Sequence, residues 1–309
     1  MMALEPSYAA ALAHRWTVAP GLVLGTPAAL MGVVNVTPDS FSDGGRYGDP
    51  DAALGAATAM RSAGAAWLDV GGESTRPGAL PVAADDELRR VLPVVRALVG
   101  LGLPISIDTS KAAVARAALA AGAAMVNDVS AGADPAMFAT VADAGCPLVL
   151  MHRQGAPADM QRAPRYADVV DEVRAFLAAR LAAAVAAGVR EDAIVLDPGI
   201  GFGKSLTHNL ALLRAVPALA ADSGRPLLIG VSRKAFLAAA AGVDLPPSER
   251  DGLAHLVHAA LAPHCALLRV HDVAGAAAAL RLAAALRAPD TAAPHAPDTA
   301  APHAPEAGR

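Results

Sequence analysis

Aromatic side chains, cysteines and charged residues are all scarce in this sequence. Phe, Trp and Tyr together make up 3% of the 309 residues, and Lys plus Arg number 25 against 29 for Asp plus Glu. A nucleic-acid-binding protein typically needs a basic surface or aromatic side chains that stack on bases. We therefore expect no nucleic-acid partner.

Only two cysteines are present, Cys146 and Cys265, and their spacing matches no metal-binding or redox motif. Structural disulfides are rare in the cytosol, so this cysteine usage is typical of a cytoplasmic protein. Cys146 precedes an apolar run and is interpreted as a small core residue. We predict a cytoplasmic location and no catalytic cysteine.

Long apolar runs are missing as well. No run that is free of turns and charges reaches the ~20 residues that span a bilayer, and residues 1–15 lack the basic and apolar regions of a signal peptide. We expect no membrane association. Hydrophobic residues nevertheless make up 54% of the chain, and many of them are Ala, which favours a large core packed by helices.

Short apolar runs alternate with Ala-rich helical stretches along most of the chain. The predicted strands cover residues 30–35, 66–70, 104–108, 123–127, 147–152, 193–197, 226–231 and 266–271. The predicted helices cover residues 51–62, 84–99, 111–120, 134–144, 168–187, 207–216, 248–262 and 273–287.

Eight strand–helix units over about 250 residues are the number expected for a (β/α)8 barrel. We therefore predict an α/β protein with the (β/α)8 TIM-barrel fold. An open, doubly wound sheet is the alternative, but its first strand–helix turn usually carries G-x-G-x-x-G, and no such motif follows Asn35.

The predicted organisation is a single domain with two flanking segments. Residues 1–27 form an irregular N-terminal lead-in, and residues 28–287 form the barrel. Residues 288–309 contain the repeated motif Ala-Pro-Asp-Thr-Ala-Ala-Pro-His. Since this composition has too little apolar bulk to fold, we predict a disordered tail.

Polar side chains stand at the end of every predicted strand, where TIM barrels place their active sites. One set of residues offers donors for an anion such as phosphate: Thr75, Arg76, Lys204, Arg233, Lys234, Arg269 and His271. A second set, Asp108, Asn127 and Asp197, suits a flat heterocycle rich in N–H groups. A single Asp before a helix is more often an N-cap, so the hypothesis depends on the coincidence over eight strands.

Asn35 ends the first predicted strand and is a plausible contact for Mg²⁺, which keeps several waters and uses phosphate oxygens as ligands. The segment DPGIGFGK, residues 197–204, is not a P-loop, because the spacing between its glycines is one residue short. It is either an ordinary strand–helix turn or a segment that lines the binding site. In the second case Phe202 would stack on an aromatic substrate.

Eight segments together resemble the dihydropteroate synthase family. They are MGVVNVTPDSFSDGG (31–45), DVGGESTRPGA (69–79), ISIDTSK (105–111), VNDVSAG (126–132), LVLMHRQG (148–155), LDPGIGFGK (196–204), GVSRKAFL (230–237) and LLRVHDV (267–273). The resemblance implies a (β/α)8 barrel and a transferase of folate biosynthesis. The implied reaction joins 6-hydroxymethyl-7,8-dihydropterin diphosphate to 4-aminobenzoate and releases diphosphate.

The resemblance also implies roles for individual residues. Asn35 would be a ligand of the Mg²⁺ that holds the diphosphate. The implied pterin contacts are Asp108, Asn127, Asp197 and Lys234, and the implied diphosphate contacts are Thr75, Arg269 and His271. The aminobenzoate site would be shaped by Arg76, Pro77, Phe202 and Ser232. Of these, Asp108, Lys234, Arg269 and His271 are the implied catalytic residues, and a homodimer is typical of the family.

Two alternatives stay open at this point. A pterin-dependent methyltransferase would share the pterin pocket but would not need the diphosphate contacts. A non-catalytic pterin-binding paralogue would be expected to lose one of the site residues, and none is lost. Two positions depart from the family pattern, Arg153 and Leu253, and Arg153 adds a charge near the rim. Phe41 is a candidate contact on a loop over the aminobenzoate site.

Overall fold

The computed structural model describes residues 15–36, 49–74, 78–156 and 158–288. Its central feature is a ring of parallel strands. Within the described ranges these strands are β3 (Ala29–Asn35), β4 (Trp67–Gly71), β5 (Ile105–Asp108), β6 (Met125–Asp128), β7 (Leu148–Met151), β8 (Ile194–Asp197), β9 (Leu228–Ile229) and β10 (Leu267–Val270).

The sheet order is β8-β7-β6-β5-β4-β3-β10-β9, with each neighbouring pair parallel. A parallel bridge between Leu196 and Leu227 joins β8 to the segment before β9 and so closes the ring. The predicted (β/α)8 TIM barrel is confirmed. The seventh strand is much shorter than the predicted range 226–231, because only its middle residues form a regular ladder with β10.

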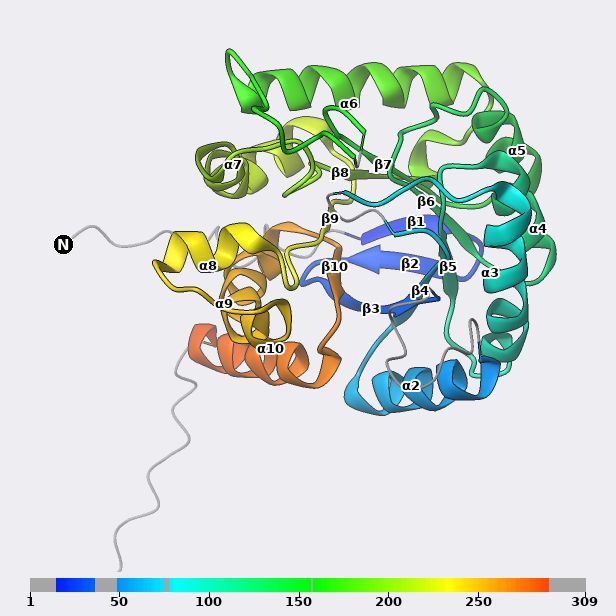
Figure 1. Ribbon diagram of the computed structural model, residues 1–309, viewed down its shortest axis with the longest axis horizontal. Helices are drawn as coiled ribbons and strands as arrows, with labels where there is room; N and C mark the ends of the chain where they lie inside the picture. Colours follow the sequence, from blue (N-terminus) through cyan, green and yellow to red (C-terminus); the bar gives the residue numbers. More distant parts are fainter. Residues whose placement is uncertain (1–14, 37–48, 75–77, 157, 289–309) are drawn as a thin grey trace, which may run out of the picture.

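The helices lie outside this ring (Figure 1). They are α2 (Pro50–Ala63), α3 (Ala84–Val99), α4 (Ala112–Ala120), α5 (Met137–Ala144), α6 (Val169–Ala186), α7 (Leu206–Ser223), α8 (Ala235–Ala241), α9 (Asp251–Leu261) and α10 (Val273–Arg287). Short 3-10 segments, η1 (Glu191–Ala193), η2 (Pro247–Arg250) and η3 (Ala262–His264), precede β8, α9 and β10.

Two helices differ from the sequence-based expectation. Helix α7 continues past the predicted end at residue 216 and contains Pro217. Helix α8 was not predicted, because its seven residues are fewer than the roughly 11–18 residues over which a helical apolar period can be recognised.

Small side chains allow the helices to pack closely against the strands. Ala53, Ala57, Ala115 and Ala118 are fully buried among larger side chains from the sheet. This explains the high Ala content of the chain, since an Ala face lets two elements approach without leaving gaps. No helix among the described residues is both long enough and apolar enough to cross a bilayer.

An antiparallel hairpin precedes the barrel, in the segment that the sequence analysis took as irregular. Its strands are β1 (Arg15–Ala19) and β2 (Leu22–Gly25). Val18 and Leu24 are buried in the same cluster as side chains from inside the barrel, among them Met31, Trp67 and Met125. The expectation of an irregular lead-in was wrong for residues 15–25, because this hairpin completes the core at one end of the barrel.

Both cysteines are buried and free, as expected for core residues. Burial raises the pKa of Cys146 to about 11 and raises the pKa of Cys265 still further. Neither thiol forms the thiolate that a nucleophile or metal ligand needs near neutral pH.

Candidate active site

The carboxyl ends of the strands gather polar side chains at one rim of the barrel. Asp69, Asp108, Asn127 and Asp197 are each at or near the end of a different strand and are all at most 7% exposed. They are brought together because parallel strands end on the same side of the sheet. Arg269 from the last strand reaches into this group.

Arg269 joins two buried carboxylates. Its Nε donates to Asp69 Oδ2 at 2.6 Å, and its Nη2 donates to Asp108 Oδ2 at 2.8 Å. Asn127 Nδ2 also donates to Asp69 Oδ2, at 3.1 Å. Burial opposes the charge on Arg269, but Asp69 and Asp108 outweigh this effect and raise the pKa of the guanidinium. Arg269 therefore stays charged.

Asp108 is held at the boundary between its two protonation states. Burial is the largest effect and raises its pKa, the Arg269 charge lowers it, and the neighbouring carboxylates of Asp69 and Glu87 raise it again, to a final value of about 7. A carboxyl group with this pKa titrates near neutral pH, which is unusual for Asp and typical of functional sites.

Two opposite charges interact after the ends of β8 and β9, those of Asp197 and Lys234. Asp197 Oδ1 accepts a hydrogen bond from the backbone N–H of Gly199 at 2.7 Å, and its charge acts on the buried Lys234. Burial lowers the pKa of Lys234 to about 8, although Asp197 partly offsets this effect. The Lys234 ammonium lies 4.4 Å from the centre of the Phe202 ring, a cation–π contact.

Ser232 and His271 form a hydrogen-bonded pair beside these charges. Ser232 Oγ accepts from the backbone N–H of His271 at 3.2 Å and lies 3.0 Å from His271 Nδ1. The pair links the loop after β9 to the end of β10, so that the hydroxyl and the imidazole face the same space.

These groups line one narrow cavity. Its lining comprises Asp108, Asn127, Val129, Met151, Asp197, Phe202, Gly230, Ser232, Lys234, Arg269 and His271. The structure thus brings together eight of the predicted site residues. Thr75, Arg76 and Pro77 lie outside the described residues, as does Phe41.

Asn35 is the last residue of β3 and pairs with Gly71 of β4, so it reaches the same rim. It is half-buried and does not line the cavity itself. Among the residues that the structure describes, no group of three or more His, Cys, Asp and Glu side chains could hold a metal ion.

Two cations of the predicted anion-binding set have other roles. Lys204 is 3% exposed and its Nζ lies beneath the turn after β8, within hydrogen-bond distance of His152 Nδ1 and of three backbone carbonyls. The Arg233 guanidinium binds both carboxylate oxygens of Asp251, at 3.1 and 2.9 Å. Both were assigned from their place after a strand, which does not reveal where the side chain points.

Asp69 is the residue to which the sequence analysis gave no role. Its carboxylate is completely buried and receives hydrogen bonds from both Arg269 and Asn127. Its place at the end of a predicted strand was visible in the sequence. What the sequence could not show is that it shares Arg269 with Asp108.

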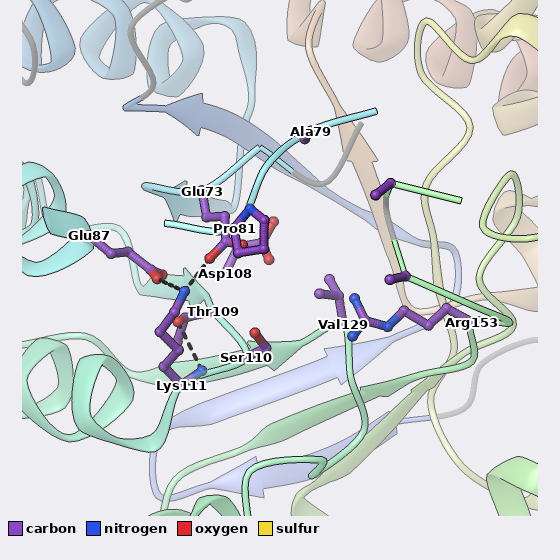
Figure 2. A pocket seen from close by; sticks show the side chains of 12 residues that line it. Glu73, Ala79, Pro81, Glu87, Asp108, Thr109, Ser110, Lys111, Val129 and Arg153 are labelled. Atoms are coloured by element: carbon purple, nitrogen blue, oxygen red, sulfur yellow. Dashed lines mark hydrogen bonds and ion pairs between the residues drawn. The ribbon is translucent and has the colours of Figure 1, made fainter. Parts of the chain in front are cut away.

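A second cavity of about 260 Å³ opens beside Asp108, on the side of the β4–α3 and β7–α6 connections (Figure 2). Lys111 at its edge forms ion pairs with Glu73 and with the fully buried Glu87, the latter at 2.5 Å. Arg153, one of the departures from the family pattern, reaches across this cavity toward Val129.

Comparison with known proteins identifies the family. The sequence pattern of the pterin binding enzyme family matches residues 31–271 of this chain. The dihydropteroate synthase of Mycobacterium leprae is 51% identical over 266 residues, which cover 84% of this chain and 93% of the relative. The chain belongs to the dihydropteroate synthase family.

Solved structures of this family agree in fold. The Xanthomonas albilineans dihydropteroate synthase with 4-aminobenzoic acid superposes with a TM-score of 0.81 at 44% identity, covering 90% of this chain and all of that one. A second structure of that enzyme, in complex with 7,8-dihydropteroate, gives a TM-score of 0.78 at 42% identity over 89% of this chain and 99% of that one.

Family membership confirms the sequence-based identification and the assignment of the chain as a transferase of folate biosynthesis. It excludes the methyltransferase alternative, because the matching relatives are dihydropteroate synthases over most of their length.

Proposed function

We propose that the cavity binds 6-hydroxymethyl-7,8-dihydropterin diphosphate and, next to it, 4-aminobenzoate, and that the two are joined there to 7,8-dihydropteroate. The observation that carries this proposal is the network in which Arg269 connects Asp69 and Asp108. It places carboxylates and a fixed positive charge a few ångströms apart, as a substrate with an N–H-rich ring and an anionic leaving group requires.

The buried polar groups suit the pterin ring. Asp108 and Asp197 can each accept hydrogen bonds from N–H groups of the ring, and Asn127 can both donate and accept. A carboxylate receives two parallel hydrogen bonds from an amidine-like edge in the same way as from an Arg side chain. Met151 and Val129 supply apolar surface for the faces of the ring.

The cations beside this pocket suit the diphosphate. Arg269 and His271 lie at the end of β10. A diphosphate leaving group needs its negative charge balanced as its bond to the pterin methylene breaks. The electron-poor methylene is stabilised by the Asp108 carboxylate, and the amine of 4-aminobenzoate then attacks it. Diphosphate leaves with the electron pair of the bond that breaks, and the amine nitrogen loses a proton to solvent once its bond to the methylene has formed.

The aminobenzoate site is proposed at Phe202, Lys234 and Ser232. Phe202 offers a ring face for stacking, and Lys234 and Ser232 offer donors for the carboxylate. Arg76, Pro77 and Thr75 complete this site in the proposal on the basis of the family resemblance. Their positions lie outside the described residues.

Mg²⁺ is proposed as the metal. Asn35 fits it through its neutral amide oxygen, because Mg²⁺ retains several waters and takes its other ligands from phosphate oxygens rather than from a cage of carboxylates. When bound, Mg²⁺ would neutralise charge on the diphosphate. Substitution of Asn35 by Ala should raise the Mg²⁺ concentration needed for half-maximal binding of the diphosphate substrate. An unchanged concentration would remove Asn35 from the metal site.

The direct test is a reaction with purified protein, the pterin diphosphate, 4-aminobenzoate and Mg²⁺. We expect dihydropteroate and diphosphate in equal amounts. Binding of the pterin without product, in a folded protein, would favour the non-catalytic paralogue and contradict the proposal.

A homodimer is proposed for the assembly. Leu256 on α9 and Leu282 and Leu286 on α10 are 63–79% exposed, and these two helices pack against each other. Exposed leucines on adjacent helices are typical of a surface that a second copy covers. Sedimentation should show a dimer, and Leu282→Glu with Leu286→Glu should give a monomer. The matched control is Val99→Glu on α3, which should remain dimeric.

A further inference from the structure

The backbone of the turn after β8, residues 199–203, lies very close to the segment after β7, so that positions in the turn have no room for a Cβ atom. Gly199 has φ +67° and Gly203 has φ +64°, both in the left-handed region. A Cβ at Gly199 would overlap the carbonyl oxygen of His152, and one at Gly203 would overlap the carbonyl oxygen of Gln154. The backbone of the turn therefore lies directly on the segment that follows β7.

Lys204 occupies the inside of this turn. It is 3% exposed, and its Nζ donates to the carbonyl oxygens of Gly199 at 2.8 Å and Phe202 at 3.1 Å. Its Nζ also lies 2.9 Å from His152 Nδ1 and 3.4 Å from the His152 carbonyl oxygen. One ammonium group thus connects both ends of the turn to the end of the neighbouring strand β7.

The remaining carbonyls of the turn point outward and have different donors. Lys234 Nζ donates to the Ile200 carbonyl, Gln161 Nε2 to the Gly201 carbonyl at 2.6 Å, and Tyr166 Oη to the Gly203 carbonyl at 2.9 Å. The shape that Lys204 imposes from inside therefore decides where the Ile200 carbonyl can receive Lys234. It also decides where the Phe202 ring meets the Lys234 ammonium.

The position of Lys204 requires a side chain that donates hydrogen bonds, and not only one that fills the same volume. An apolar side chain in place of Lys204 would remove the side-chain donor from the Phe202 carbonyl and leave the Gly199 carbonyl with only the backbone N–H of Phe202, at 3.1 Å. Such a turn would rearrange so that its carbonyls reach water. Phe202 and the Ile200 carbonyl would move with it.

We propose that Lys204 is a positioning residue whose ammonium group fixes the turn 199–203 in the shape that presents Phe202 to the substrate cavity and the Ile200 carbonyl to Lys234. The effect should be larger on 4-aminobenzoate than on the pterin. The reason is that two of the three groups proposed for the pterin, Asp108 and Asn127, stand on β5 and β6 and have no bond to this turn, whereas only Asp197 is bonded to it, through the backbone N–H of Gly199. This distinction rests on the proposed function.

The central experiment compares the wild type with Lys204→Met, which keeps most of the volume and removes the donors. We expect the KM for 4-aminobenzoate to rise about tenfold to a hundredfold, because small misplacements of binding groups have effects of this size. The KM for the pterin diphosphate should change by much less. Hydrogen–deuterium exchange should become faster in peptides that cover residues 199–204.

Arg180→Met is the matched control. Arg180 also holds a turn from within the fold, donating to the carbonyls of Ala131 at 2.7 Å and Gly132 at 3.1 Å. The residue of that connection that lines the cavity is Val129, which is proposed to contact the pterin and not 4-aminobenzoate. This variant should lose comparable stability and keep the KM for 4-aminobenzoate. If Lys204→Met does not fold, Lys204→Gln replaces it, because the Gln amide retains two donors. This variant should show the same difference between the changes in the two KM values, with a smaller magnitude.

Each outcome decides the proposal. Unchanged exchange at 199–204 in Lys204→Met or Lys204→Gln would overturn it, as would a parallel rise of both KM values with a lower unfolding midpoint, which indicates a merely structural lysine. The exchange measurement needs no catalysis. If the wild type makes no dihydropteroate, the proposed function fails, whereas the effect of Lys204 on the turn is still tested.

Discussion

Arg269 Nη2 donates a hydrogen bond to Asp108 Oδ2 at 2.8 Å, and this bond uses the same carboxylate that the pterin ring is proposed to bind. The ring and Arg269 therefore compete for Asp108. When the pterin takes the carboxylate, the guanidinium keeps its bond to Asp69 and has its Nη2 donor free for the diphosphate. The contact is a resting arrangement in which each charge is balanced before the substrate arrives.

Removal of the guanidinium should therefore affect both Asp108 and the leaving group. For Arg269→Met we expect kcat/KM for the pterin diphosphate to fall by about 10²–10³, the size typical of a lost transition-state donor. The pKa of Asp108 should rise further, because Arg269 is the charge that lowers it. Steady-state kinetics and the pH profile measure the two effects, and a variant with wild-type kcat/KM would contradict the assignment.

The pH dependence of kcat/KM should be bell-shaped around pH 7–8. Asp108 has a pKa of about 7, so below this pH it becomes a neutral acid and loses the charge that favours the pterin. Lys234 has a pKa of about 8, so above this pH it loses its positive charge. The profile should therefore decline on both sides.

Lys234→Arg tests the alkaline side of this profile. A guanidinium does not titrate in this range, so the decline at high pH should disappear or move upward while the acid side stays in place. A profile with the same alkaline side would show that another group titrates there.

His258 should reduce the stability of the protein. It is fully buried on α9, neither ring nitrogen has a hydrogen-bond partner among the described residues, and burial lowers its pKa to about 3. Replacement by Leu should raise the free energy of unfolding by about 1 kcal/mol at neutral pH, because two unpaired polar atoms are removed.

The gain from His258→Leu should grow as the pH falls. Between pH 6.5 and 3 the unfolded chain binds a proton at His258 and the folded chain does not, so acid destabilises the wild type at this position. Urea unfolding at pH 5 and pH 8 measures the difference. A gain that is equal at both values would show that His258 is not neutral in the folded state.

Lys111→Met should destabilise the fold. The substitution leaves the completely buried Glu87 without its cation, and an uncompensated buried charge costs about 3 kcal/mol or more. The double variant Lys111→Met with Glu87→Leu should recover most of this loss, since both partners are then apolar. Chemical unfolding of the wild type, the two single variants Lys111→Met and Glu87→Leu, and the double variant forms the double-mutant cycle, and additive effects would contradict the coupling.

The barrel could be predicted because the apolar pattern that indicates a strand or helix lies within the residues of that element. Most of the strands and helices show an apolar pattern of their own, as in α3 and α10, whose ends were predicted to the residue. The β1–β2 hairpin was missed because its short strands are stabilised by contacts with barrel residues distant in sequence, such as Trp67 and Met125. A pattern within residues 15–25 does not contain that information.

In the candidate site too, some residues could be predicted from the sequence and others could not. Asp108, Asn127 and Asp197 were predictable because each lies at or next to the last residue of a parallel strand, and such residues meet at one rim of the barrel. Lys204 and Arg233 were assigned to the wrong surroundings because long side chains choose their partners from the whole fold. Nothing near them in the sequence indicates the carbonyls of the turn or Asp251.

The hairpin packs Val18 and Leu24 into the end of the barrel opposite the strand ends that carry Asp108 and Asp197. Among the described residues, that packing closes the lower end of the barrel, and the substrates are expected to approach from the rim. If the pterin diphosphate occupies the inner position, 4-aminobenzoate is expected to add after it. Dihydropteroate would then leave from the same rim before the next cycle.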